Sequence, residues 1–454
     1  MYTSLEAIEA EAKRSPRRSG SRRRAVFLAV LISTSSSPPC PMPAPAAAAD
    51  AAPRSSRVLT FKGAAHLRHR LVLSLLSRRP VRIDAIRADD DEPGLRPYEV
   101  SFLRLVEKLT QGSRLEISYS GTSLLFHPGT IQGGQVTHQC PNDRGVGWFL
   151  EPLLAIAPFG KKDLALTLRG VTTDGRDASV DTVRTSGLPH LAMFLDADGL
   201  ELRITKRGHP PLGGGEVTFT CPSVRAIKSG FDFMSVGRIT KIRGIAHSVR
   251  VSPQLANRLV AAARSVLNRY IPDIYIYTDV YRGEDSGKSP GYAITLVASS
   301  TSHVLHSAEA SSCPPPSSSA SSSAPAEPAH PPVPEDLGIA CARLLLDEIR
   351  RGGCVDRGWE WLVTTMLVLG GEDVGRVVVA GQFEAFLVEH LRDLKAFFGT
   401  TFKIKEAVRT AAAAGATEDG EDARMASTGG AAPPQEYVLS CVGTGFTNTA
   451  KRAG

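Results

Sequence analysis

An internal repeat constrains the fold of this 454-residue chain more strongly than any single motif. Three times, apolar residues at helical spacing are followed by a glycine and then by apolar residues that alternate as in a strand. The glycines are Gly112, Gly199 and Gly399, and glycine often ends a helix because it adopts the left-handed conformation at little cost. The copies are FLRLVEKLTQGSRLEISYSG (102–121), LPHLAMFLDADGLELRITKRG (188–208) and FLVEHLRDLKAFFGTTFKIK (386–405). Because separate segments share one pattern, the pattern predicts a repeated α/β unit.

A second apolar helix and a short strand precede each copy. These segments are LRHRLVLSLLSRRPVRIDAI (67–86), WFLEPLLAIAPFGKKDLALTLRG (148–170) and WEWLVTTMLVLGGEDVGRVVVAG (359–381). The first two copies also share an ending, HPGTIQGG at 127–134 and HPPLGGGEV at 209–217. We therefore expect an α/β (α+β) protein of three repeated units, each with two helices and four strands.

The stretch from 237 to 300 interrupts this rhythm. A strand-like ITKIRGIAHSVRV leads to a helix that starts near Ser252, and the strands DIYIYTDVY and YAITLVAS follow. This predicts a small α/β domain inserted between the second and third units. Three other segments have compositions that cannot pack a core. The predicted organisation is a disordered basic extension (1–57), repeats 1 and 2 (58–236), the insert (237–300), a low-complexity linker (301–334), and repeat 3 (335–454) with a disordered loop at 407–436.

Composition narrows the function only slightly. The net charge of +7 and the pI near 9.1 favour acidic partners such as RNA, but they do not separate an RNA binder from a basic enzyme. The seven cysteines are never arranged as C-x-x-C, which favours reduced thiols over a disulfide framework or a zinc ribbon. No stretch approaches the roughly 20 apolar residues that span a bilayer, so we expect no membrane partner.

The N-terminal extension can be interpreted in two ways. The run of arginines at 22–24 followed by AVFLAVLI is similar to a short signal peptide, which suggests a secreted or organellar protein. Alternatively, these arginines together with Arg17 and Arg18 form a nuclear-localisation segment.

The order of units and the local sequence resemble the RNA 3′-terminal phosphate cyclases. The matching segments are VRIDAIRADDDEPGLRPYEVSFLRLVEKLTQGS, FHPGTIQGG, KRGHPPLGGGEV and TKIRGIAHSVRVSP. Other segments resemble the cyclase-like, ribosome-assembly branch of that superfamily, namely PGLRPYEVSFLRL, VGWFLEPLLAIAPFGKK, VYRGEDSGKSPGYAITLVA, LRDLKAFFGTTFKIK and GTGFTNTAKR. The resemblance runs from about Leu59 to Lys451, apart from the low-complexity stretches.

Two departures from the enzymes' pattern bear on activity. Active cyclases share a glycine-rich loop near the N-terminus and a histidine, after a late apolar strand, that attacks ATP to form a covalent adenylate. Here the first place reads FKGAAHLRHR, and the late strand is followed by Gln382 and Phe383. His390 falls inside the following helix. Because glutamine has no comparable nucleophilic nitrogen, we expect no cyclisation by the enzymatic route.

Candidate anion-binding residues lie in two places. Lys62, His66, Arg68 and Arg70, with Arg57, could form a basic face for an RNA backbone, or an ordinary solvated helix face. His66 and His69 have a spacing that suits two metal ligands, but with no third ligand we expect no metal site. Gly213, Gly214 and Gly215 could present backbone amides to a phosphate, or form a tight turn. The segment GEDSGKS (283–289) is similar to a P-loop but is one residue short, so we expect a turn between two strands.

Arg392, Asp393 and Lys395 are candidates for a nuclease site. An acid beside two bases could assist RNA cleavage, and a nuclease role has been considered for this family. A surface ion pair along the helix explains the same residues. Trp359 and Trp361 are expected to pack in the core rather than to stack on RNA.

The resemblance implies a scaffold rather than an enzyme. We expect a non-catalytic ribosome-biogenesis factor of the small-subunit processome that binds a ribosome-assembly GTPase, contacts pre-rRNA in the nucleolus and needs no cofactor. The alternatives are a residual cyclase and a pre-rRNA endonuclease.

Overall fold

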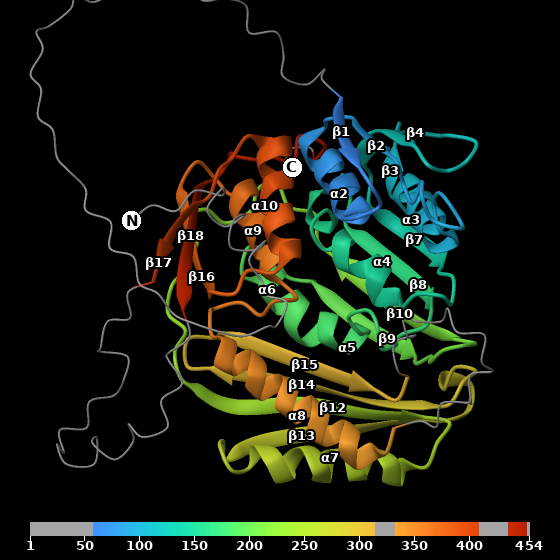
Figure 1. Cartoon of the computed structure of the whole chain (residues 1–454), viewed down its shortest axis with the longest axis vertical. Coiled ribbons are helices and arrows are strands. Elements are labelled where there is room, and N and C mark those ends of the chain that lie inside the picture. Colours follow the sequence, from blue (N-terminus) through green and yellow to red (C-terminus); the bar gives the residue numbers. More distant parts are fainter. Residues whose placement is uncertain (1–57, 314–331, 408–434, 452–454) are drawn as a thin grey trace, which may run out of the picture.

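The computed structural model describes residues 58–313, 332–407 and 435–451. The basic extension, most of the expected linker and most of the expected loop at 407–436 therefore lie outside the described residues. The described chain forms a larger part with three four-stranded sheets, one two-stranded sheet and their helices, and a smaller part with one four-stranded sheet and two α-helices (Figure 1). No helix within these ranges is both long and apolar enough to cross a membrane.

Three four-stranded sheets of the larger part share one strand order. In each, the first and second strands run parallel, the fourth pairs antiparallel with the second, and the third lies at the edge. The first sheet has the order β1-β2-β5-β4, the second β7-β8-β10-β9 and the third β11-β16-β18-β17.

The elements of these three sheets follow the chain. The first unit contains β1 (Leu59–Lys62), α2 (Leu67–Ser77), β2 (Val81–Asp84), α3 (Pro97–Leu109), β4 (Arg114–Ile117) and β5 (Leu124–His127). The short strands β3 (Thr110–Gln111) and β6 (Thr130–Ile131) pair beside it. The second unit contains β7 (Gly134–Gln139), α4 (Val146–Leu153), η2 (Ala157–Phe159), β8 (Leu164–Gly170), the helical run α5 (Val180–Thr182), η3 (Val183–Gly187) and α6 (Leu188–Ala192), then β9 (Glu201–Lys206) and β10 (Gly215–Cys221). The third contains β11 (Asp232–Phe233), α9 (Glu360–Leu369), β16 (Val374–Ala380), α10 (Ala385–Phe398), β17 (Lys403–Glu406) and β18 (Glu436–Val442).

The position of β11 changes the expected place of the insert. This strand pairs with β16 but precedes the small part in the chain. The insert therefore separates the first strand of the third unit from its first helix, rather than separating the second and third units. The two-residue strand is too short to show an alternating pattern, so it could not be predicted from periodicity.

The smaller part is also longer than expected. It contains β12 (Ile239–Val249), α7 (Pro253–Leu267), β13 (Asp273–Tyr281), η4 (Gly283–Asp285), β14 (Gly291–Ser300), β15 (Leu305–Ser311) and α8 (Pro334–Arg351). The sheet order is β13-β12-β14-β15, and the segment 283–289 is a turn between two strands, as expected. The expected boundary at residue 300 is wrong, because β15 pairs with β14 along its length and α8 packs on the same sheet.

The helices α7 and α8 lie together over one side of the small sheet (Figure 1). They approach closely because Gly338 leaves no room for a side chain: a Cβ there would lie 2.6 Å from the backbone oxygen of Leu259. Apolar residues from both helices and the facing side of the sheet then form a core separate from that of the larger part.

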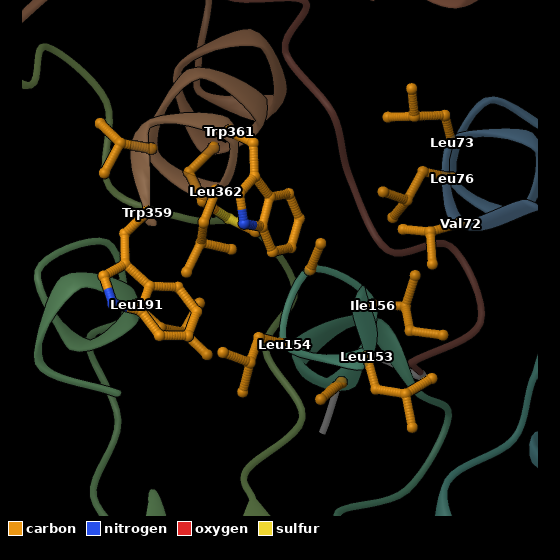
Figure 2. Close-up of a cluster of buried hydrophobic side chains, with 14 of the residues drawn as sticks. Val72, Leu73, Leu76, Leu153, Leu154, Ile156, Leu191, Trp359, Trp361 and Leu362 are labelled. Atoms are coloured by element: carbon orange, nitrogen blue, oxygen red, sulfur yellow. The ribbon is translucent and has the colours of Figure 1, made fainter. Parts of the chain in front are cut away.

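The core of the larger part surrounds two tryptophans. Trp359 and Trp361, each 2% exposed, belong to this core, and Figure 2 shows them on the side of Leu154, Leu191 and Leu362, with the aliphatic residues of α2 across the core. Gly187 is required beneath them, because a Cβ at this position would lie 2.6 Å from the Trp359 ring. The expected packing role of both tryptophans is confirmed.

Candidate functional site

A cavity of about 1040 Å³ lies between the larger and smaller parts. Its walls come from α4, the loop 173–178, β15, α8 and the segment before α9. A second cavity of about 170 Å³ lies at the N-terminal end of α2. Arg68 and Arg144 line both cavities, and we call the two together the cleft.

The arginines of the cleft are bound by carboxylates. Arg68 contacts Glu151 at 3.2 Å and also donates a hydrogen bond to the backbone oxygen of Trp148. Arg144 makes a two-bonded pair with Asp177, with distances of 2.9 and 2.5 Å. Both guanidinium groups also lie over the Trp148 ring, at 4.6 and 5.5 Å from its centroid. These contacts hold the cations in place and occupy their hydrogen-bonding edges.

The surroundings of Glu151, whose side chain is 16% exposed, favour its charged form. Burial alone would raise its pKa, but the Arg68 charge and the hydrogen bond with His69 lower that pKa to about 2. Across the lining of the larger cavity there are seven acidic residues and four arginines. The arginines are therefore more than matched by acids, which disfavours binding of a polyanion such as a nucleoside triphosphate.

A cluster of neutral histidines lies at the N-terminal end of α2. His66 stacks on Phe386 with ring centroids 4.6 Å apart, and His69 lies between Phe386 and Trp361. Burial is the main cause that lowers the pKa of His66 to about 4 and the pKa values of His69 and His390 below 6.5. Among the described residues, no group of three or more His, Cys, Asp or Glu side chains could hold a metal ion.

The end of β16 carries no imidazole. The strand stops at Ala380, and Gln382 follows with an exposed side chain and a backbone oxygen that accepts from Arg351. His390 lies in the second turn of α10, is 1% exposed, and its Nε2 lies 2.8 Å from the hydroxyl of Thr365. It is thus enclosed in the core.

The expected basic face on α2 is largely absent. Lys62 is exposed on β1, and His66 is partly buried at the helix start. Arg68 points into the cleft, and Arg70 is buried against Asp393 of α10 with an Nε to Oδ2 distance of 2.9 Å. This part of the expectation is wrong because α10 and α4 cover the side of α2 that carries these residues.

The three nuclease candidates do not converge on one site. Asp393 faces α2, Arg392 contacts Glu389 at 2.5 Å, and Lys395 is exposed at the rim of a different groove. The carboxylate of Asp393 is therefore used in a buried ion pair and is not positioned together with both bases toward solvent.

The glycine turn at 213–215 packs against the smaller part. Gly213 and Gly214 have φ angles of +61° and +86°, which glycine adopts readily. The Gly213 amide donates to the oxygen of His209 at 2.9 Å, and the Gly213 oxygen accepts from the amide of Lys288 at 2.8 Å. A Cβ at Gly214 would lie about 3.1 Å from Lys288. The turn is thus explained by close backbone packing on 283–289, and one of its amides is already bound.

A buried charged junction was not foreseen from the sequence. Arg207, fully buried, contacts Asp181 at 2.5 and 3.0 Å and Asp279 of β13 at 3.0 Å. Its Nη1 also lies 3.2 Å from His247 Nδ1, and His247 Nε2 lies 3.1 Å from His209 Nε2. These residues join the second unit to β12 and β13. The available signal was the histidine in the strand segment IAHSV and the arginine and histidine of RGH directly after the alternating strand LELRITK.

Comparison with known proteins identifies the family. The family model for RNA 3′-terminal phosphate cyclase matches residues 59–404. The RNA 3′-terminal phosphate cyclase-like protein of Homo sapiens is 47% identical over 394 residues, which cover 87% of this chain and 97% of that protein. The rRNA processing protein rcl1 of Schizosaccharomyces pombe is 45% identical over 395 residues, with 86% of this chain and 97% of that protein covered. The chain therefore belongs to the RNA 3′-terminal phosphate cyclase family, in its cyclase-like branch.

Proposed function

We propose that this chain is a non-catalytic member of its family that acts as a scaffold in small-subunit rRNA maturation. The observation that carries the proposal is the end of β16, where Gln382 stands and the nearby His390 is enclosed against Thr365. A nucleophile that takes up AMP must reach the α-phosphorus in line with the leaving group. Neither side chain meets this requirement.

The electrostatics of the cleft support the same conclusion. Phosphoryl and nucleotidyl transfer depend on cations that stabilise charge on the phosphate oxygens. In this cleft Glu151 and Asp177 engage Arg68 and Arg144. A triphosphate would have to displace these carboxylates, so the cleft suits a partner segment of mixed charge better than ATP.

The role in rRNA maturation draws on the fission yeast relative, which is named as an rRNA processing protein. Within this role we place the chain in the small-subunit processome of the nucleolus, beside a ribosome-assembly GTPase that supplies nucleotide hydrolysis. These finer assignments extend the family resemblance to the present chain.

One observation favours residual cyclase activity as a second candidate. His66 lines the smaller cavity beside Arg68 and Arg144, and its pKa of about 4 leaves the imidazole neutral and nucleophilic at physiological pH. Its ring is stacked on Phe386, however, and the adjacent arginines are paired with acids.

The deciding assay incubates purified protein with labelled ATP and a 3′-phosphorylated RNA, beside an active cyclase. We expect neither a covalent adenylate nor a cyclic phosphate from the wild-type chain. An adduct lost in His66→Ala but kept in His390→Ala would establish the second candidate and overturn the first. In cells depleted of the endogenous protein, the wild-type chain should restore early pre-rRNA cleavages, as read by northern blotting of precursors.

A further inference from the structure

The sheet of the smaller part has one face that is only half covered. Its buried face packs on α7 and α8 through Ile242, Ala246, Ile274 and Ile276. Because strand residues alternate between faces, the odd-numbered neighbours of these residues point the other way. One end of this second face meets the larger part through the Arg207 junction, where Asp279 and Tyr281 are bound.

The other end of the same face is open and carries two tyrosines. Tyr275 and Tyr277 are 61% and 56% exposed. Cross-strand neighbours on β12 are Arg243, opposite Tyr275, and Ile245, opposite Tyr277, while Lys241 lies one step further along. We call Lys241, Arg243, Ile245, Tyr275 and Tyr277 the tyrosine face. β13 is the outer strand of the sheet, away from the larger part (Figure 1).

The chemistry of this face favours a nucleic acid over an apolar protein partner. Two aromatic rings on alternate positions of one strand offer stacking surfaces separated by roughly 7 Å, twice the rise per strand residue. The adjacent strand contributes two cations. Arg243 makes a two-bonded pair with Asp273, at 2.8 and 2.9 Å, whereas Lys241 is exposed and is therefore the cation that meets a phosphate. Ile245 is the aliphatic member of the face. Aromatic rings interleaved with cations on an open sheet are how proteins bind single-stranded RNA, because bases stack on the rings and phosphates approach the cations.

A peptide that added a strand to β13 would not depend on the two tyrosine rings in the way that a stacked RNA does. It would pair with the backbone at the sheet edge, whereas the two rings project from the broad side. Substituting the rings would then change binding far less than blocking the backbone.

We propose that the tyrosine face is a binding platform for single-stranded RNA, with one base stacked on each of Tyr275 and Tyr277 and the phosphate backbone passing Lys241. The proposal rests on the proposed role in rRNA maturation and specifies where the RNA is held. It is independent of the cleft, whose lining contains none of the five residues of the tyrosine face.

The test measures binding of the full chain to a short fluorescein-labelled oligouridylate by fluorescence anisotropy. Each tyrosine-to-alanine change should weaken binding by at least about fivefold, the lower end of the range for base stacking. Tyr275→Phe and Tyr277→Phe should retain wild-type affinity because the ring faces remain. Lys241→Ala should reduce the salt dependence of binding rather than abolish binding.

Tyr270→Ala is the matched control. Tyr270 is 66% exposed but belongs to the turn before β13, off the sheet face, so its loss should leave affinity unchanged. All variants should keep the wild-type thermal unfolding curve, since the changed side chains are exposed. Equal binding by wild type and by Tyr275→Ala/Tyr277→Ala would overturn the platform, as would an equal loss in Tyr270→Ala. The cell assay then separates the two proposals: restored pre-rRNA cleavage by the double variant would leave the maturation role intact while removing the platform.

Discussion

Arg70 and Asp393 form a buried ion pair between the first and third units, with an Nε to Oδ2 distance of 2.9 Å. The guanidinium also lies over the Phe61 ring, 4.2 Å from its centroid, and donates to the backbone oxygen of Ala65. The pair thus links α2 to α10 through two residues that are 323 positions apart in the chain. Residues that suggested RNA binding and RNA cleavage in the sequence are here partners in one structural contact.

Asp393→Ala should destabilise the protein strongly. Removing one partner of a buried pair leaves the other charge uncompensated, which typically costs about 3–5 kcal/mol. Thermal or urea unfolding of the purified chain measures this. Lys395→Ala, an exposed change on the same helix, should alter stability by less than about 0.5 kcal/mol. If Asp393→Ala kept wild-type stability but lost RNA cleavage, the carboxylate would have a catalytic role after all.

The sequence predicted the helices and strands of the larger part well because their apolar periodicity is strong. Helices such as α3, α9 and α10 have extensive buried surfaces. Gly399 ends α10 in the left-handed conformation as expected, whereas α3 ends at Leu109 with an extended residue, Thr110, and Gly112 follows the short strand β3. The predicted fold class is confirmed by the family model.

The candidate site was harder to predict, for a physical reason. Whether Arg70 or Asp181 is exposed depends on which distant element covers it, and periodicity along one segment does not contain that information. The same limit applies to β15, whose sequence LHSAEAS is too polar to indicate a strand until β14 is beside it. Charged residues that pair across 323 positions look like surface residues when each helix is considered alone.

The titration of Asp356 should lower the free energy of unfolding as pH rises. Its carboxylate is 2% exposed and accepts hydrogen bonds from Ser307 and Ser186, while its Oδ1 is buried without a partner. Burial is the main cause that raises its pKa from 3.8 to about 7. Between these two values the folded state binds more protons than the unfolded state, so the free energy of unfolding falls as pH increases. Asp356→Asn should flatten this dependence, by roughly 1.4 kcal/mol for each unit of the shift removed.

The measurement is urea unfolding at a series of pH values across this window. Glu360, whose pKa burial raises to about 8, titrates nearby, so Glu360→Gln provides the matched comparison. The two windows, 3.8 to about 7 for Asp356 and 4.5 to about 8 for Glu360, overlap. Asp356→Asn should therefore leave the slope only in the Glu360 window, and Glu360→Gln should leave it only in the Asp356 window. An unchanged slope in Asp356→Asn would show that this carboxyl group titrates near its ordinary value.

The Arg207 junction should fix the smaller part against the larger one. Arg207→Met leaves Asp181 buried without its main partner, at a cost of about 3–5 kcal/mol. The double change Asp181→Asn/Arg207→Met should recover part of this loss because the fully buried charge of Asp181 is removed, and the remaining partner, Asp279, is partly exposed to solvent. Hydrogen exchange should show increased opening at β9 and at the ends of β12 and β13. If the increase in hydrogen exchange were confined to α10, Arg207 would not be what fixes the smaller part against the larger one.

The same junction predicts acid sensitivity. Burial opposes ionisation of Asp181, but the Arg207 charge outweighs burial and holds the pKa of this carboxyl well below 3.8. A carboxyl whose pKa is depressed by folding stabilises the protein above its unfolded pKa and loses that contribution as pH falls below it. The stabilisation should therefore be constant at neutral pH and decline below about pH 4. In Asp181→Asn this decline should be smaller than in the wild type.

Glu151 controls the charge available in the cleft. The carboxylate neutralises Arg68 at 3.2 Å, so Glu151→Gln should free that guanidinium for an anion. Binding of ATP or inorganic pyrophosphate, measured by isothermal titration calorimetry, should strengthen about tenfold, as expected when about 1.4 kcal/mol of competing ion pairing is removed. Asp347→Asn removes a charge from the exposed rim of the same cavity and should change affinity less, because solvent screens that group. Equal affinity in wild type and Glu151→Gln would show that Arg68 does not bind the anion. Tighter binding of ATP without formation of a covalent adenylate would show that the charge of the cleft limits binding, whereas the missing nucleophile limits the reaction.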